Sequence, residues 1–160
     1  MLELNRISAG YGKQTVLDGI SVDFEKGKLT SIIGVNGCGK STLLKAILGI
    51  LSLSSGEIFI DGENLLTISR NEIAKKIAYL SQGKNIPDMT VEQMVLHGRF
   101  PYLSYPRRYS SHDREVAIKA MEIVGVAEFA HKPLYSLSGG MRQNAYIAMA
   151  LAQDTDYILL

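Results

Sequence analysis

A glycine-rich segment in the first third of the chain has the residue types of a phosphate-binding loop. Residues 34–41 read GVNGCGKS and match the pattern G-x-x-x-x-G-K-[ST]. Glycines in such a loop let backbone N–H groups turn toward phosphate oxygens, and the helix that follows adds the positive end of its dipole. The pattern predicts that the ammonium of Lys40 reaches the β- and γ-phosphates of a nucleotide and that the hydroxyl of Ser41 ligates Mg²⁺. We interpret Cys38 as a small filler residue, because the loop needs backbone donors rather than a thiol.

A second candidate anion site lies about a hundred residues further on. Residues 137–143 read LSGGMRQ and lead directly into a predicted helix. A serine followed by two glycines at a helix start leaves backbone N–H groups free to bind an anion. Two separated phosphate-binding helix starts in one chain suggest that the second one serves a nucleotide held by another copy.

The residues around both segments predict the elements that position them. The apolar, β-branched run Leu29–Ile33 predicts a buried strand before the first loop. Residues 40–48 have helical spacing, with Gly49 as the stop. Further strands are predicted at Val22–Phe24, Glu57–Ile60 and Ala78–Leu80.

Capping signals predict the helices of the second half. Ser69 with Glu72, and Thr90 with Gln93, are capping-box pairs, and Gly98 is predicted to close the second of these helices. A third helix is predicted to begin at the N-cap Ser111 and to end at Gly125, with Asp113 in its first turn, and Met141–Ala152 is predicted to form a buried helix.

The composition excludes several classes of protein. The 160 residues include 17 Lys+Arg against 16 Asp+Glu, and a net charge of +1 argues against a protein that coats polyanions. The hydrophobic fraction of 46% and charged fraction of 21% are typical of a folded domain, and a single cysteine cannot form an internal disulfide. Uncharged stretches fall short of the roughly 20 apolar residues of a membrane span, and residues 1–6 lack the apolar region of a signal peptide. We therefore expect a soluble, intracellular, single α/β domain.

Two further patterns carry weaker alternatives. Arg99–Tyr109 interleaves arginines with aromatic residues, which is compatible with nucleic-acid binding, but the near-zero net charge favours a proline-broken connector between helices. His97, His112 and His131 lack the spacing of metal ligands, and we expect them at the surface or at caps.

Together, GVNGCGKS and LSGGMRQ resemble the Walker A loop and the signature of the nucleotide-binding domain of ABC transporters. The resemblance covers essentially the whole chain, and it adds Tyr11 as the aromatic residue that stacks on adenine and Gln82 as the Q-loop glutamine that touches Mg²⁺ and the attacking water. It implies an α/β P-loop NTPase (RecA-like) core with an N-terminal antiparallel β part. Residues 1–83 and 138–160 would form this core and residues 84–137 an inserted helical subdomain, within a single partial domain.

The resemblance also implies a composite site for ATP and Mg²⁺, with Ser41 and Gln82 at the metal. One copy would supply Tyr11, Gly34, Asn36, Gly37, Cys38, Gly39, Lys40, Ser41, Thr42 and Gln82, and the other copy would supply Ser138, Gly139 and Gly140. Implied partners are a second copy in a head-to-tail dimer, transmembrane permease subunits and, indirectly, an extracytoplasmic solute-binding protein. No nucleic-acid partner is implied, and the location would be cytoplasmic, peripheral on the inner face of the cell membrane.

Residues 96–101 (LHGRFP) and 148–154 (AMALAQD) look most like importers of iron-siderophores, haem or cobalamin. The implied function is the ATP-binding subunit of such an importer, which couples Mg-ATP binding and hydrolysis to uptake. Two alternatives stay open: the ATPase of a non-transport ABC protein of DNA repair or translation, and a catalytically inactive nucleotide-binding or interaction module.

The sequence departs from the family pattern at its end. Tyr157–Leu160 fills the apolar part of the Walker B strand, but the Asp and Glu that follow it in the family, the D-loop and the switch histidine are absent from these residues. Asp154 and Asp156 precede the strand and do not replace those acids. We expect the 160-residue chain to hydrolyse ATP negligibly, because a lost general base alone costs on the order of 10²–10⁴ in rate, and to be poorly soluble or oligomeric, because its sheet edge is open.

Overall fold

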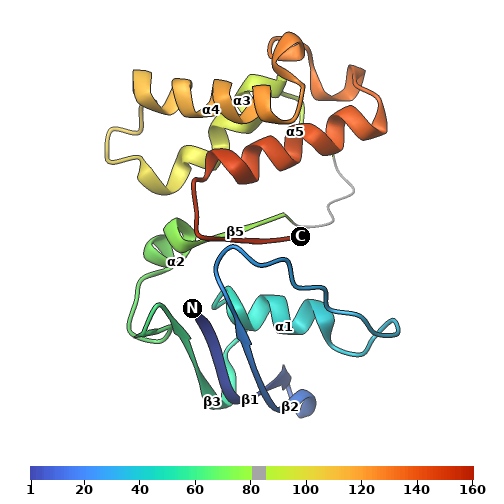
Figure 1. The fold of residues 1–160 in the computed structure, drawn as a ribbon, viewed down its shortest axis with the longest axis vertical. Coiled ribbons are helices and arrows are strands. Elements are labelled where there is room, and N and C mark those ends of the chain that lie inside the picture. Colours follow the sequence, from blue (N-terminus) through green and yellow to red (C-terminus); the bar gives the residue numbers. More distant parts are fainter. Residues whose placement is uncertain (81–85) are drawn as a thin grey trace. The chain divides into compact units, whose positions relative to one another are not determined.

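A computed structural model describes residues 1–80 and 86–160, which divide into the units Met1–Lys76 and Ile77–Leu160 (Figure 1). Each unit has its own set of packed elements and is described separately below. The predicted assignment of residues 1–83 and 138–160 to one core, with 84–137 inserted, stays a prediction.

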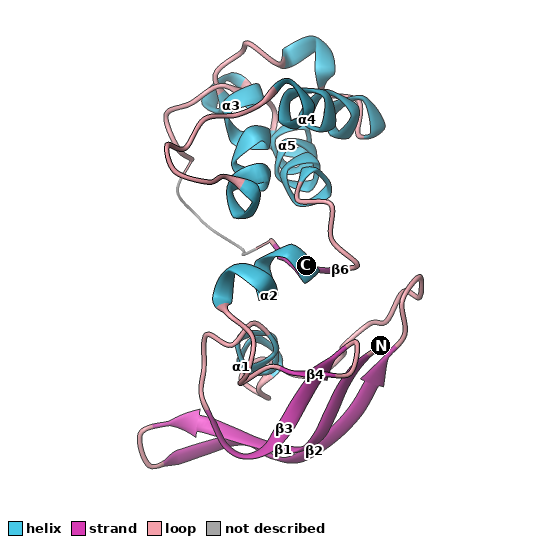
Figure 2. Cartoon of the chain, turned by 90° about the vertical axis from the view of Figure 1, so that its left-hand side faces the viewer, coloured by secondary structure: helices cyan, strands magenta, loops and turns pink. Residues whose placement is uncertain are grey.

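The first unit is built on an antiparallel sheet with the strand order β2-β1-β3-β4. Its elements are β1 (Leu2–Tyr11), β2 (Gln14–Phe24), α1 (Lys40–Ile47), β3 (Leu53–Ile60), β4 (Glu63–Asn64) and α2 (Arg70–Lys76). The strands predicted at Val22–Phe24 and Glu57–Ile60 are confirmed as the ends of β2 and β3. Helix α1 lies over one face of the sheet and contacts β1 and β2 (Figure 2).

Strand β1 changes its buried face partway along. Leu2 and Leu4 are buried, then Ile7 and Ala9, so the alternation shifts by one residue at Asn5–Arg6. Arg6 has a positive φ of 46°, and the register with both neighbouring strands is irregular at this point, which identifies a β-bulge. Because of the bulge, the apolar residues on both sides of it point to the buried face of the sheet, on which α1 packs.

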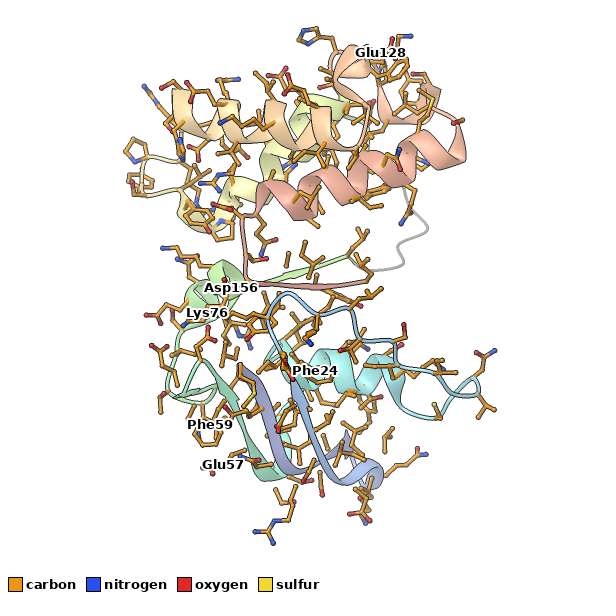
Figure 3. The ribbon with its side chains drawn as sticks, viewed as in Figure 1. Phe24, Glu57, Phe59, Lys76, Glu128 and Asp156 are labelled. Atoms are coloured by element: carbon orange, nitrogen blue, oxygen red, sulfur yellow. The ribbon has the colours of Figure 1, made fainter. Side chains whose placement is uncertain are left out.

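Strand β3 alternates between the core and the surface. Ile58 and Ile60 are buried, while Glu57 is exposed and Phe59 is partly exposed, and Figure 3 shows Glu57 and Phe59 projecting from the strand. The Asp61–Gly62 pair then turns the chain into β4 with φ values of 54° and 82°, as a two-residue hairpin turn with two left-handed residues requires.

The predicted strand at Leu29–Ile33 is wrong in this structure. No strand of the described residues includes this segment, and Leu29 and Ile33 are 97% and 92% exposed. A buried parallel strand needs hydrogen-bonding neighbours and layers on both faces. Among the described residues the one parallel pair, β5 with β6, is formed without this segment.

The second unit packs three α-helices around an apolar core (Figure 2). Its elements are β5 (Ile77–Tyr79), α3 (Val91–Leu96), the 3₁₀ helix η1 (His97–Tyr102), α4 (Ser111–Ile123), the 3₁₀ helices η2 (Ala127–Phe129) and η3 (Leu134–Ser136), α5 (Gly139–Ala152) and β6 (Tyr157–Leu159). Small residues on α5 allow close packing against α3 and α4: Ala145, Ala148 and Ala152 are fully buried.

Most capping predictions are confirmed, with two corrections. Ser69–Glu72 and Thr90–Gln93 both form reciprocal capping-box bonds. The N-cap of α4 is Ser110 rather than Ser111, because the Ser110 hydroxyl accepts from the N–H of Asp113. Gly98 does not end a helix.

Gly98 instead lies inside η1 against α5. A Cβ at this position would overlap the carbonyl oxygen of Met149. The glycine is therefore required by the close approach of two backbones rather than by a helix stop.

Candidate functional site

The glycine-rich loop runs directly into α1 with two left-handed glycines. Gly37 and Gly39 have φ values of 82° and 99°, which favour glycine over residues with a Cβ. Gly39 is the N-cap, no side chain caps the helix, and its first described backbone bond is from the N–H of Leu43 to the Gly39 carbonyl. The N–H groups of the first turn thus remain available to a ligand, together with the positive end of the helix dipole.

The side chain of Lys40 folds back over the loop. Its Nζ donates to the carbonyl oxygens of Gly34 and Val35 at 2.8 and 2.9 Å, and it lies 3.8 Å from the Cys38 sulfur. Neutral carbonyls are weaker acceptors for an ammonium than an ionised phosphate oxygen is. A phosphate oxygen can therefore replace these two carbonyl oxygens as the acceptor of the Lys40 ammonium and form stronger hydrogen bonds with it.

Cys38 is exposed, and its sulfur lies beside Gly34 in the loop. A Cβ on Gly34 would lie 2.6 Å from the Cys38 sulfur, so the thiol fills the space that the glycine leaves. This geometry agrees with the interpretation of Cys38 as a filler residue. Asn36 and Gly37 form the turn at the exposed tip of the loop.

The donor set of this loop fits Mg²⁺ bound with phosphate. Ser41 is exposed on the first turn of α1, and Thr42, the next residue, is buried. Magnesium is commonly held by few protein ligands together with phosphates and waters. Among the described residues no group of three or more His, Cys, Asp or Glu side chains is arranged to hold a metal by itself.

Tyr11 lies at the end of β1, beside the turn into β2. The residue is 49% exposed, and its hydroxyl accepts a hydrogen bond of 3.3 Å from the Nζ of Lys45 on α1. Tyr11 is therefore linked to the same helix that begins with Lys40 and Ser41. Lys45 was not predicted as a site residue, and only its place in the last turn of the helix that follows the glycine-rich loop pointed to it.

Val16 and Leu17 support the loop from the sheet. A Cβ on Gly39 would lie 3.2 Å from side-chain atoms of both residues. The start of α1 therefore packs directly on β2, and a side chain at position 39 would need a small shift of these neighbours in addition to the left-handed backbone.

In the second unit, Ser138 caps α5. Its hydroxyl accepts from the N–H of Met141 at 3.3 Å, and Gly139 and Gly140 form the exposed first residues of the helix. A Cβ at either glycine would meet no atom within 4 Å, so their side-chain faces are open to a partner. Gln82 lies outside the described residues, and its predicted role stays a prediction.

The buried pair Arg99–Asp113 was not predicted to be structurally important. Both residues are buried, at 4% and 6% exposure, and the pair lies in the second unit at the end of α5. The sequence signal was the arginine within the aromatic run Arg99–Tyr109, which was interpreted only as a connector.

Comparison with known proteins supports the predicted resemblance. A family model described as "ABC transporter" matches residues 17–160. The petrobactin import ATP-binding protein FpuD of Bacillus anthracis is 41% identical over 99% of this chain, and the iron(3+)-hydroxamate import ATP-binding protein FhuC of Bacillus subtilis (strain 168) is 40% identical over 99%. The chain spans 59% and 60% of the lengths of these relatives.

The fold of the chain is also similar to that of a solved ABC transporter cassette. The dimeric structure of a bacterial ABC transporter cassette superposes with a TM-score of 0.79 at 27% identity, over 99% of this chain and 72% of that one. The predicted P-loop α/β fold and the predicted likeness to siderophore importers are thus confirmed. None of the helices formed by residues 1–80 and 86–160 has the length and apolar character needed to cross a membrane.

Proposed function

Because the chain belongs to the ABC transporter family, we propose that it forms the ATP-binding part of an importer ATPase and that residues 34–42 hold the phosphates of Mg-ATP. The observation that carries the proposal is the Lys40 ammonium, which is bonded to two loop carbonyls beside the uncapped start of α1. In this proposal the N–H groups of the loop surround the β- and γ-phosphates, Lys40 transfers its hydrogen bonds to them, and the Ser41 hydroxyl ligates Mg²⁺.

The base of the nucleotide stacks on Tyr11. Tyr11 at the end of β1 is about half exposed, and aromatic stacking contributes on the order of 1–3 kcal/mol per base in nucleic-acid complexes. Gln82 completes the metal and water contacts as the family resemblance implies.

The second anion site acts on a nucleotide held by another copy. Ser138, Gly139 and Gly140 present an open helix start in a unit separate from the phosphate loop. A head-to-tail dimer would bring each of these helix starts to the phosphates held by the partner. The bacterial ABC transporter cassette compared above was solved as a dimer, which supports the proposal that two copies associate.

The transported solute is an iron-siderophore or a related chelate, with haem and cobalamin in the same proposed class. Support comes from the names of the relatives, which import petrobactin and iron(3+)-hydroxamate. The intact protein would work at the inner face of the cell membrane with permease subunits, and a solute-binding protein would deliver the chelate to them.

Trans-complementation tests the composite site. Mixed dimers of a Lys40→Met copy and a Gly140→Asp copy contain one site with both defects and one site with neither, whereas each homodimer has two defective sites. We expect ATP-dependent uptake of ferric siderophore to recover in cells that express both variants and to fail in cells that express either one alone. No recovery, with both proteins present at normal levels, would contradict the shared site.

A further inference from the structure

Lys45 makes a side-chain contact that the proposed phosphate chemistry does not use. Its Nζ donates to the Tyr11 hydroxyl at 3.3 Å and lies 5.6 Å from the centre of the Tyr11 ring. Among the described residues, Tyr11 is the only side chain that receives a hydrogen bond from Lys45, and no carboxylate lies within salt-bridge distance of it.

The backbone of Lys45 is held firmly. Its carbonyl oxygen accepts from the N–H groups of Ile50 and Leu51 at 2.9 and 3.1 Å, which closes the C-terminal end of α1. Its neighbours Ala46 and Ile47 are fully buried in the core of the first unit. The ammonium therefore extends from a rigid point on the helix that begins with Lys40.

Tyr11 is less restrained without this contact. It is the last residue of β1, it pairs with Gln14 across the turn, and half of its surface is exposed. An exposed aromatic side chain loses rotamer freedom when a ligand stacks on it, and this loss reduces affinity. A hydrogen bond at the far end of the ring removes part of that freedom before the ligand arrives.

We propose that Lys45 is a positioning residue for the base of the bound nucleotide: it fixes the ring of Tyr11 relative to the helix that carries Lys40 and Ser41. The inference rests on the proposed nucleotide function of this site and goes beyond it, because it assigns part of the base affinity to a cation outside the glycine-rich loop that acts through Tyr11. The hydroxyl of Tyr11, which stacking alone does not require, is the atom through which Lys45 acts.

The proposal separates base binding from phosphate binding. Inorganic tripolyphosphate offers the phosphates of ATP without the base, so its affinity depends on Lys40 but not on Tyr11 or Lys45. A role of Lys45 as a general positive charge near the phosphates would instead affect ATP and tripolyphosphate equally.

The test compares magnesium-loaded ATP and tripolyphosphate binding to the intact protein by calorimetry. Lys45→Met removes the donor with little change in volume, Tyr11→Phe removes the acceptor and keeps the ring, and Lys45→Arg keeps a donor. We expect Lys45→Met and Tyr11→Phe each to weaken ATP binding about three- to tenfold, as expected for one side chain released from restraint. Lys45→Arg should restore most of the affinity, and tripolyphosphate binding should be unchanged in all three variants.

The double variant Lys45→Met/Tyr11→Phe gives the sharpest result. If both residues act through one hydrogen bond, the double variant binds ATP no more weakly than either single variant. Additive losses, an equal loss for tripolyphosphate, or wild-type ATP affinity in Lys45→Met would each overturn the proposal. Failure of the wild-type protein to bind ATP at all would instead refute the proposed nucleotide function, so the two failures are distinguishable.

Discussion

The guanidinium of Arg99 lies 3.0 Å from the carboxylate of Asp113, and both side chains are buried among the helices of the second unit. Arg99 also donates to the carbonyl oxygen of Ala152, at the last residue of α5, and stacks 4.0 Å from the centre of the Tyr102 ring. Asp113 accepts from both the N–H and the hydroxyl of Ser110 at the start of α4. The pair thus joins η1, the start of α4 and the end of α5, the helix that begins with the signature segment.

Replacement of one partner should leave a buried charge without compensation. We expect Arg99→Met to lower the free energy of unfolding by about 3–5 kcal/mol, and Arg99→Met/Asp113→Asn to lower it by less than the sum of the single losses. Urea denaturation of the intact protein, followed by the circular dichroism of its helices, measures both losses in the free energy of unfolding. Arg108→Met, at an exposed position close by, is the control and should change stability by less than about 0.5 kcal/mol. Strict additivity of the two single losses would show that the pair does not act as a unit.

Acid should weaken the first unit through Asp61. Partial burial acts to raise the pKa of this carboxyl, but hydrogen bonds from the N-terminal amine and Lys26, with their charges, outweigh it and lower the pKa from 3.8 to about 2. A depressed folded pKa means that the stabilisation is complete above pH 3.8 and disappears as the pH falls toward about 2.

Asp61→Asn is the matched variant, because asparagine also accepts the left-handed backbone found here. We expect the stability difference between wild type and variant to be constant near neutral pH and to shrink over that acid range. Thermal unfolding at a series of pH values measures this difference, and a difference that grows on acidification would be the opposite of the expected sign.

Because the Cys38 sulfur lies beside Gly34, substitutions at these two positions should affect ATP affinity in a coupled way. Gly34→Ala places a Cβ against the Cys38 sulfur, which must move from its place beside the Lys40 ammonium, so that ATP binding should weaken about two- to fivefold. Cys38→Ala removes the sulfur and should by itself leave ATP affinity close to that of the wild type. Together the two changes should restore part of the lost affinity, and an unchanged defect in the double variant would argue against this steric cause.

Gly98 should tolerate no side chain. Gly98→Ala would force η1 away from the Met149 carbonyl and should cost about 1–3 kcal/mol of stability in the helical unit. Gly140→Ala is the control for the same substitution, because a Cβ there meets open space, and it should leave the denaturation midpoint nearly unchanged. Equal effects at the two glycines would show that the backbone contact is not the reason for Gly98.

Local signals predicted the helix starts well, because a capping box is complete within four residues. Thr90–Gln93 and Ser69–Glu72 needed no information from the rest of the fold. The glycine-rich loop before α1 was recognisable for the same reason, since its glycines, Lys40 and Ser41 form one continuous motif, and its role in phosphate binding stays a prediction.

Features that depend on distant partners were missed. Leu29–Ile33 has strand composition, but strand formation requires hydrogen-bonding neighbours that composition does not specify. Arg99 appeared to be one of several arginines in a connector, and only the packing of α4 and α5 identifies it as the buried one. Gly98 was interpreted as a helix stop, although the backbone of α5 explains it.

The central claim is tested most directly by the affinity of the intact protein for Mg-ATP with and without Lys40. Isothermal titration of the wild type and of Lys40→Met, with circular dichroism to verify folding, gives the comparison. The account predicts that the wild type binds and that Lys40→Met, equally folded, binds about 10- to 100-fold more weakly, as expected for the loss of charge-assisted hydrogen bonds to phosphate. Equal Mg-ATP affinity in the two proteins would contradict it.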